Sequence, residues 1–518
     1  MEVSTKNKDL AKFSLEDALN LSGFGKYNIS LLAVCSLLIM AMYIDIFGFS
    51  VALPSAACDM RLTTSQQGIL SAVPLIGVMI SSYAWGLCAD TLGRRTTLLY
   101  AMPIGMLLNL AASVAPTFTS LAVLKFFSGG FTSSANAAAF VLLGESVPLR
   151  FSGRAIFLMA SATMFVQFII CVIALPIIGL TFTINVPWLS MTYRPWRLLL
   201  QMICIPGIVG TIGVFFMLES PKFLLSQGKE EAATDVLRNI YRFNKGSTAD
   251  YPVKTIILEE TFMADEKVPF YRKIWNQTAP LFKPPLLKNS LMLYYILLCA
   301  FMTSTGYTMW VPTMTNAFFN GEDRSGKTFC EVASTAATPT NTSTTDCDSV
   351  IKPMTIYAVI CYSGISGFLN ILLTFIVTPL GKKKSTLLIF AIPLISGIIL
   401  LFIRIPILSI IMFYIFLYVV LVLGNINAYL QELNPTYLRG MATCLSVVVA
   451  RGFGFFSVQI IGSLLGNYCT HMISGYIVLI FTGMIVTFFL PSDKSETECI
   501  KIEKTSSVVE NGIERTAL

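Results

Sequence analysis

Charged residues are scarce in this sequence: Asp, Glu, Lys and Arg together make up 13% of its 518 residues, about half of the share typical of a soluble domain. Histidine occurs once, at His471, and no group of cysteines and histidines has metal-ligand spacing. The chain also has no glycine-rich phosphate loop and no nucleophile triad. These absences argue against a soluble domain, an enzyme, a metal or nucleotide cofactor and an ATP-driven pump.

Apolar residues, in contrast, make up 55% of the chain. They gather in runs of about 20 residues, the length at which an α-helix crosses the ~30 Å hydrocarbon core of a bilayer. The sequence therefore predicts an all-α integral membrane protein with twelve transmembrane helices. The polar first 26 residues predict that no cleavable signal peptide is present. The expected spans lie at residues 29–53, 66–88, 96–115, 119–144, 155–180, 198–218, 289–313, 353–379, 384–403, 406–430, 441–466 and 471–491.

The basic residues predict the orientation of these spans. With both termini placed in the cytoplasm, 27 of the 36 Lys and Arg residues fall in cytoplasmic segments, seven in outer loops and two within spans. This bias follows the positive-inside rule, so the net charge of +7 reports topology and not a nucleic-acid partner. The resulting parts are a cytoplasmic segment 1–28, a first six-helix half 29–218, a cytoplasmic linker 219–288, a second half 289–491 with an outer loop 314–352, and a cytoplasmic tail 492–518.

The segments outside the membrane carry their own signals. Cys330 and Cys347 share the outer loop, where an oxidising compartment permits a disulfide, although two free thiols are the alternative. Asn341-Thr-Ser in the same loop is a glycosylation acceptor pattern. Residues 1–28 fit either a short interfacial amphipathic helix or a loosely ordered tail. The linker 219–288 has apolar residues at helical spacing, which predicts helices lying against the membrane, with a solvated linker as the alternative.

Two charged residues lie inside the expected spans at matching depth. Asp45 is eight residues from the outer end of span one, and Lys125 is about eight residues into span four, so both lie roughly 12 Å below the outer surface. A carboxylate inside a span is costly and marks a functional site by default. We expect Asp45 and Lys125 to pair, and protonation of Asp45 would then release Lys125. The alternatives are that Lys125 extends to the outer headgroups and that Asp45 lies at a water-exposed helix end.

Two stretches at span ends recur in both halves. Gly86-Leu-Cys-Ala-Asp90-Thr-Leu-Gly93-Arg94-Arg95 between spans two and three corresponds to Thr374–Lys383 between spans eight and nine, where Thr378 replaces the carboxylate. The pattern Glu-x-x-Pro followed by Arg and Gly closes spans four and ten. This internal repeat predicts a carrier with its site between two halves. The expected cytoplasmic gate consists of Gly86, Asp90, Gly93, Arg94, Arg95, Glu145, Arg150, Arg154, Glu432 and Arg439, with Asp90 contributing most of its energy.

The stretch Gly86–Arg95 resembles the signature loop of the major facilitator superfamily. Further stretches resemble its synaptic vesicle glycoprotein 2 and organic ion transporter branch, and they are Leu53-Pro-Ser-Ala56, Tyr193-Arg-Pro-Trp-Arg197, Glu219-Ser-Pro221, Tyr307-Thr-Met-Trp-Val-Pro312 and Glu432-x-x-Pro435. The resemblance covers all twelve spans and implies that spans one, four, seven and ten line a central cavity. The chain departs from it in Lys125, where the family usually has Arg, in a shorter outer loop, and in Asn427, where vesicle members have an acidic residue.

These observations predict a secondary transporter that moves a small organic solute by alternating access, with Asp45 as a proton or cation site. A membrane scaffold or vesicle receptor that keeps the fold without transporting is the alternative, and an organic-cation uniporter is a third possibility. We expect a monomer in the plasma membrane or an intracellular vesicle membrane, with the lipid bilayer and the solute as its partners. The residues do not identify the solute. The expected cavity residues are Asp45, Lys125, Asn136, Tyr307, Trp310, Asn425, Asn427 and Arg451, the last near mid-membrane for an anionic substrate or a structural role.

Overall fold

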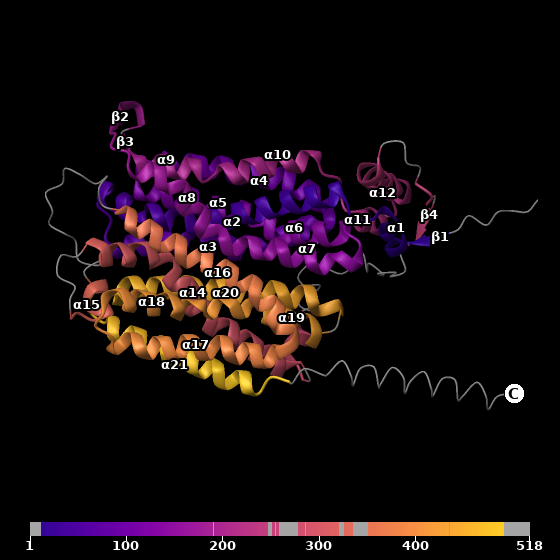
Figure 1. Cartoon of the computed structure of the whole chain (residues 1–518). Coiled ribbons are helices and arrows are strands. Elements are labelled where there is room, and N and C mark those ends of the chain that lie inside the picture. The colour runs from indigo at the N-terminus through magenta and orange to yellow at the C-terminus, as the bar shows by residue number, and fades with distance from the viewer. Residues whose placement is uncertain are drawn as a thin grey trace, which may run out of the picture.

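The computed structural model describes residues 12–189, 191–246, 251–253, 255–257, 278–284, 286–320, 326–334, 351–434 and 436–491. Among these residues, twelve helices are long and apolar enough to cross a membrane, as the sequence predicts. The helices of the first half form one bundle, and those of the second half form another bundle beside it (Figure 1).

The membrane-spanning elements of each half follow the chain order, and several spans are built from more than one helix. The first half contains α2 (Lys26–Asp59), α3 (Thr64–Leu92), α4 (Arg94–Ser113), α5 (Phe118–Thr132), α6 (Ser134–Ser146), α7 (Leu149–Ala162), η1 (Thr163–Phe165), α8 (Val166–Ile178), α9 (Pro195–Met202) and α10 (Ile205–Phe216). The second half contains α14 (Leu287–Asn320), α16 (Pro353–Leu380), α17 (Lys382–Phe402), α18 (Pro406–Leu417), η6 (Tyr418–Val422), α19 (Leu423–Leu433), α20 (Thr436–Leu464) and α21 (Cys469–Phe488).

Large apolar side chains cover the outside of both bundles. Tyr100, Phe375 and Phe402 are 69%, 72% and 77% exposed, whereas residues one helical face away from them are buried. In a soluble protein such a surface would be unstable, but in a membrane the lipid tails cover it. The polar backbone groups are paired within each helix, which is the arrangement that hydrocarbon requires.

The internal repeat predicted from the sequence is present in the turns between helices. Gly93 (φ 107°) joins α3 to α4, and Gly381 (φ 85°) joins α16 to α17. Both turns use a left-handed backbone that glycine adopts without strain. Two residues later a basic side chain donates to carbonyl oxygens at the end of the last helix of its own half: Arg95 to Val214 and Phe215, and Lys383 to Phe488 and Leu490. The two halves therefore close their sixth helices in the same way.

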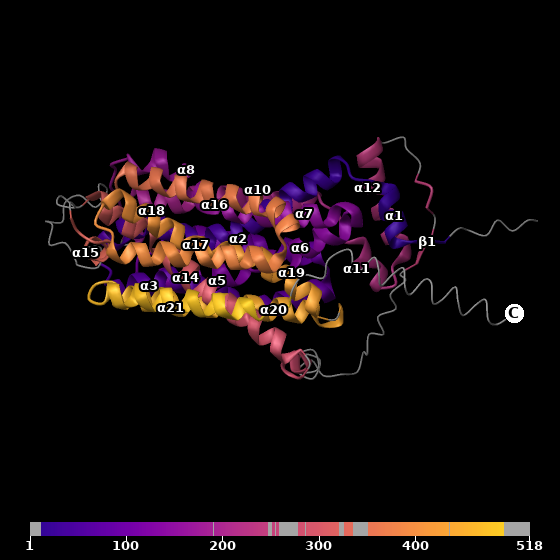
Figure 2. The same cartoon turned by 60° about the horizontal axis from the view of Figure 1, so that its bottom comes forward.

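One end of the molecule, called the α12 end below, carries additional elements. They are β1 (Lys12–Ser14), α1 (Leu15–Ser22), α11 (Pro221–Ser226), α12 (Glu230–Lys245) and β4 (Thr255–Ile257), which pairs with β1 in parallel (Figure 2). Asn244 of α12 accepts a hydrogen bond from the Tyr27 backbone N–H and donates to the carbonyl oxygens of Ser22 and Gly23. The start of the chain is thus a helix and not a loose tail, and it is bound to helices of the linker.

The opposite end, called the α15 end below, carries the hairpin of β2 (Ile184–Val186) and β3 (Met191–Tyr193), which pair antiparallel, and the short helix α15 (Phe329–Ala333). Two 3-10 turns, η2 (Pro187–Leu189) and η3 (Ala279–Phe282), complete the described elements outside the membrane. Asp59 at the end of α2 forms an ion pair of 2.9 Å with Arg194 and accepts a hydrogen bond from the Trp196 indole. This contact, which the sequence analysis missed, ties the hairpin to the first helix.

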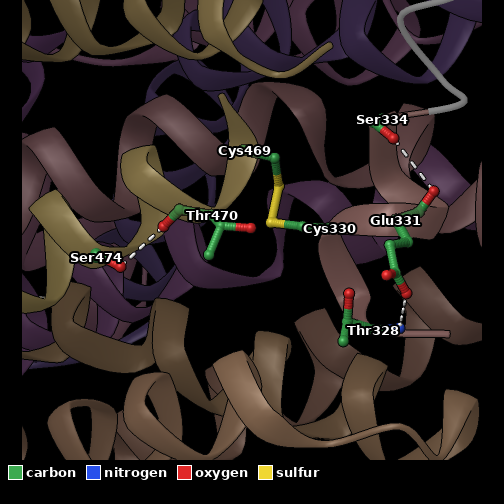
Figure 3. The surroundings of a disulfide bond; sticks show 7 residues. All are labelled: Thr328, Cys330, Glu331, Ser334, Cys469, Thr470 and Ser474. Atoms are coloured by element: carbon green, nitrogen blue, oxygen red, sulfur yellow. Dashed lines mark hydrogen bonds between the residues drawn. A yellow bond between two sulfur atoms is a disulfide. The ribbon is translucent and has the colours of Figure 1, made fainter. Parts of the chain in front are cut away.

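The disulfide of the outer loop corrects one prediction. Cys330 is bonded to Cys469 at the start of α21, so its expected pairing with Cys347 is wrong (Figure 3). The reason is the packing of α15: Phe329 is buried between Phe318 and Phe413, with ring centroids 5.0 and 4.7 Å away. That packing sets the next residue beside the first turn of α21. Cys347 itself and the glycosylation site Asn341 lie outside the described residues.

Candidate functional site

A cavity of about 100 Å³ lies between the two halves, with walls from α2, η1 and α8 on one side and α14, α16, η6, α19 and α20 on the other. At ~30 Å³ per water molecule, it has room for about three waters. The 3-10 segments η1 and η6 both border it, so two spans deviate from regular helix where they meet the cavity. Its wall includes the aromatic side chains of Tyr43, Phe47, Phe301 and Tyr362 and the polar side chains of Gln167, Ser304, Thr305, Thr308 and Arg451.

Arg451 is the charged residue of this cavity wall. It lies near the middle of α20, is 5% exposed, and its guanidinium carbon is 4.9 Å from the ring centroid of Tyr43 on α2. An arginine over an aromatic face is attracted by the ring's negative potential. This contact joins the two halves across the cavity. Of the eight predicted cavity residues, all of which are described, Arg451 alone borders the cavity.

Asp45 and Lys125 form the predicted pair, but inside the first half and away from the cavity wall. Lys125 Nζ lies 2.9 Å from Asp45 Oδ1, and the two side chains are 1% and 0% exposed. Ser128 and Thr132 donate to the other carboxylate oxygen at 2.6 and 3.1 Å, and Lys125 also donates to Asn109 at 2.7 Å. The group therefore joins α2, α4 and α5, because each buried charge has both a counter-charge and hydrogen-bond partners.

Three other predicted cavity residues are part of the second half's packing. Tyr307 is fully buried in an aromatic cluster with Phe413, Phe416 and Tyr476. Trp310 is 1% exposed and donates its indole N–H to the Val458 carbonyl at 3.2 Å. These aromatic side chains therefore do not face the cavity in this structure.

The predicted asparagines also lie away from the cavity. Asn425 donates to the hydroxyls of Ser385 and Thr386 at 2.8 and 3.1 Å, which ties α19 to the start of α17. Asn136 and Asn427 are half-buried, and neither borders the cavity. The cavity residues that the sequence analysis missed come mainly from η1, α8 and α16, and no periodicity of a uniformly apolar span distinguishes a cavity-facing side chain from a lipid-facing one.

At the α12 end, Arg94 connects the turn after α3 to α6. It lies 3.0 Å from Asp90 and 3.1 Å from Glu145, and its guanidinium carbon is 5.1 Å from the Phe223 ring centroid. Glu145 also accepts a hydrogen bond from Ser220. The side chains of Arg94 and Glu145 are 12% and 16% exposed, but that of Asp90 is 70% exposed. The prediction that Asp90 contributes most is therefore not supported, because an exposed i, i+4 pair contributes only about 0.5 kcal/mol.

Glu219, which the predicted gate set omits, binds the start of α4. Its carboxylate accepts the backbone N–H groups of Arg95 and Thr96 at 3.0 and 3.2 Å and the Thr96 hydroxyl at 3.3 Å. A carboxylate at a helix N-terminus is stabilised by the helix dipole as well as by these donors. The signal for it was the Glu219-Ser-Pro221 stretch, where the last transmembrane helix of the first half ends.

The other predicted gate residues are less connected. Gly86 lies within α3, and a side chain there would meet no atom within 4 Å. Arg150 and Arg154 are exposed, and neither forms an ion pair with any residue that the structure describes. The side chains of Glu432 and Arg439 fall outside the described part of the chain. The ion pairs seen among the described gate residues thus hold the first half to α11 and its flanking residues.

Comparison with known proteins agrees with this architecture. The family model described as Major Facilitator Superfamily matches residues 35–458. The synaptic vesicle 2-related protein of Xenopus laevis is 25% identical over 446 residues, which cover 83% of this chain and 72% of that protein. The putative transporter SVOPL of Mus musculus is 25% identical over 260 residues, so the match spans about half of its length, 49% of each chain.

Solved structures are similar in fold at lower sequence identity. The partially occluded inward-open conformation of the xylose transporter XylE from E. coli has a TM-score of 0.63 and 15% identity, and the match covers 90% of this chain and 99% of that one. The inward-open conformation of the same transporter has a TM-score of 0.62, also at 15% identity. At this identity the likeness shows the arrangement of twelve helices and not the solute.

Proposed function

The chain belongs to the major facilitator superfamily, a family of membrane transporters and not of enzymes, and from this premise we propose that it is a secondary transporter that moves a small organic solute by alternating access. The single observation that carries the proposal is the polar and aromatic cavity between the two six-helix halves. A site at the interface of two repeats opens to either side when the halves rock about it.

The buried Asp45–Lys125 group supports proton or cation coupling. Asp45 holds its charge in a fully buried site by accepting from Lys125, Ser128 and Thr132. Protonation of Asp45 would remove the counter-charge of Lys125, and the remaining partner Asn109 is neutral. Because an unpaired charge is costly inside a membrane, the contact between α2 and α5 would loosen on protonation.

The helix α2 connects this group to the cavity. Tyr43 and Asp45 are two residues apart on α2, so they point to nearly opposite faces of the helix. Tyr43 contacts Arg451 of the second half, and Asp45 contacts Lys125 of the first half. A rotation or tilt of α2 that follows protonation would therefore change the cavity contact as well.

The placement of the protein in the cell is part of the proposal. The α12 end carries the segments richest in Lys and Arg, which supports a cytoplasmic location for it and for both termini. The disulfide between α15 and α21 at the other end suits an oxidising outer or luminal compartment. Either the plasma membrane or a vesicle membrane meets these conditions, and the site lies within one chain, so a monomer suffices for transport.

Purified protein in liposomes tests the proposal with a panel of labelled organic anions, cations and sugars at two internal and external pH values. We expect accumulation of at least one solute that depends on the pH gradient. Asp45→Asn should abolish gradient-driven accumulation, whereas the exposed Asp235→Asn on α12 should leave it unchanged. Transport that survives Asp45→Asn with its pH dependence intact would refute the coupling role, and binding without any flux would favour a scaffold or receptor that retains the fold.

A further inference from the structure

The guanidinium of Arg451 lies deep in the membrane. Arg451 is fifteen residues from the start and thirteen from the end of α20, so it is about 20 Å from either end of the helix. Its side chain is 5% exposed and borders the cavity. A charge at this depth is costly unless a partner of opposite charge compensates it.

The described residues provide no carboxylate for Arg451. Its recorded contact is the Tyr43 ring, and no described acidic side chain lies within ion-pair distance of it. Asp45, the nearest acid along α2, is already bound by Lys125, Ser128 and Thr132. The cavity therefore has a positive charge on its wall that the described part of the protein does not neutralise.

Two hydrogen-bonding side chains face the same cavity from opposite halves. Gln167 of α8 is 7% exposed, and neither its amide nitrogen nor its amide oxygen has a hydrogen-bond partner among the described residues. Ser304 of α14 is 2% exposed, and its hydroxyl likewise has no described partner. Buried polar groups are normally satisfied, so unpaired ones on a cavity wall mark a place where a ligand binds.

The rest of the wall is apolar and aromatic. Tyr43, Phe47, Phe301 and Tyr362 surround the polar groups. A sugar would leave Arg451 without a counter-charge, and an organic cation would add a second positive charge beside it. A planar carboxylate matches the fork of the guanidinium and accepts from an amide and a hydroxyl, while an aromatic body fits against the rings.

We propose that this cavity binds a small organic anion, whose carboxylate is held by Arg451, Gln167 and Ser304 and whose apolar body lies against Tyr43, Phe47 and Tyr362. This assignment of the substrate class rests on the proposed function. The volume of about 100 Å³ restricts the bound group in this conformation to a small acid, and a larger body requires the halves to separate.

Binding and flux are measured separately to test it, with protein in nanodiscs for binding and in liposomes for flux. The probes are benzoate, its neutral analogue benzamide and its cationic analogue benzylamine. Benzoate should bind best, and Arg451→Gln should weaken its binding about 10- to 100-fold, the usual effect of losing hydrogen bonds to a charged group. Arg451→Lys keeps the charge but not the fork and should lose less, and the exposed Arg404→Gln serves as the matched control.

Gln167→Glu provides a second variant in case Arg451→Gln does not fold. It keeps the shape of the side chain and adds a negative charge, so it should abolish benzoate binding and permit benzylamine binding. Equal or better binding of benzamide or benzylamine to the unaltered protein, no benzoate binding, or benzoate binding unchanged by Arg451→Gln and Gln167→Glu would each overturn the anion site. Flux of a neutral or cationic solute would then still support transport, whereas benzoate binding without flux would support the site and count against the transport proposal.

Discussion

The buried ion pair of Asp45 and Lys125 should show strong thermodynamic coupling. The two groups are 2.9 Å apart and 0% and 1% exposed. Coulomb's law with an effective dielectric constant of 20 gives an attraction of about 6 kcal/mol at this distance. Removal of either partner leaves the other as an uncompensated buried charge, which typically costs about 3–5 kcal/mol. We therefore expect Lys125→Met and Asp45→Asn each to reduce the free energy of unfolding by about that amount.

The double variant Asp45→Asn/Lys125→Met removes both charges and should be more stable than either single variant. The coupling energy from the cycle should therefore be about 3 kcal/mol or more. The assay is reversible unfolding in mixed micelles, with denaturing detergent as the titrant and all four proteins compared under the same conditions. The exposed pair Asp235–Arg238 on α12, with side chains 61% and 39% exposed, serves as the control and should give a coupling of about 0.5 kcal/mol or less.

Additive effects at Asp45 and Lys125, within about 0.5 kcal/mol, would refute this reasoning. They would mean that water or lipid headgroups reach the two charges in the membrane. A coupling at the control pair as large as at the buried pair would show instead that the assay does not report local burial. A large coupling at the buried pair alone would support the view that protonation of Asp45 changes the packing of α2.

Three further predictions concern other parts of the molecule. Glu219→Gln should destabilise the protein by about 2 kcal/mol because its carboxylate accepts from three donors at the start of α4, whereas Asp90→Asn should cost about 0.5 kcal/mol or less; detergent unfolding compares them, and a larger effect at Asp90 would contradict the structure. Peptide mapping without reduction should recover a Cys330–Cys469 crosslink and unblocked thiols at Cys171 and Cys299, and a Cys330–Cys347 crosslink would contradict the assignment. If one proton at Asp45 enters with one organic monoanion, uptake should not respond to a membrane potential set by potassium and valinomycin, and potential-driven uptake would disprove that stoichiometry.

The sequence predicted the pairs of residues whose chemistry leaves few alternatives. Asp45 and Lys125 were expected to pair because each is costly alone in a membrane, and their matching depth follows from helix geometry. The contact of Arg94 with Glu145 was expected from the repeated motifs at the ends of spans two and four. The partner of Cys330 was not predictable, because it lies 139 residues away and depends on how Phe329 packs against the second half.

The sequence by itself determined the class of this protein: twelve apolar runs in a chain with few charges specify membrane-spanning helices, and the repeated motifs specify two related halves. Only the tertiary structure decided which side chains face the cavity. A span packed among other spans is apolar on every side, so its sequence carries no periodic signal for the face that lines a site. The rotation of each helix is set by packing against its neighbours, and that packing places Arg451, Gln167 and Ser304 on the cavity wall while it buries Tyr307 and Trp310.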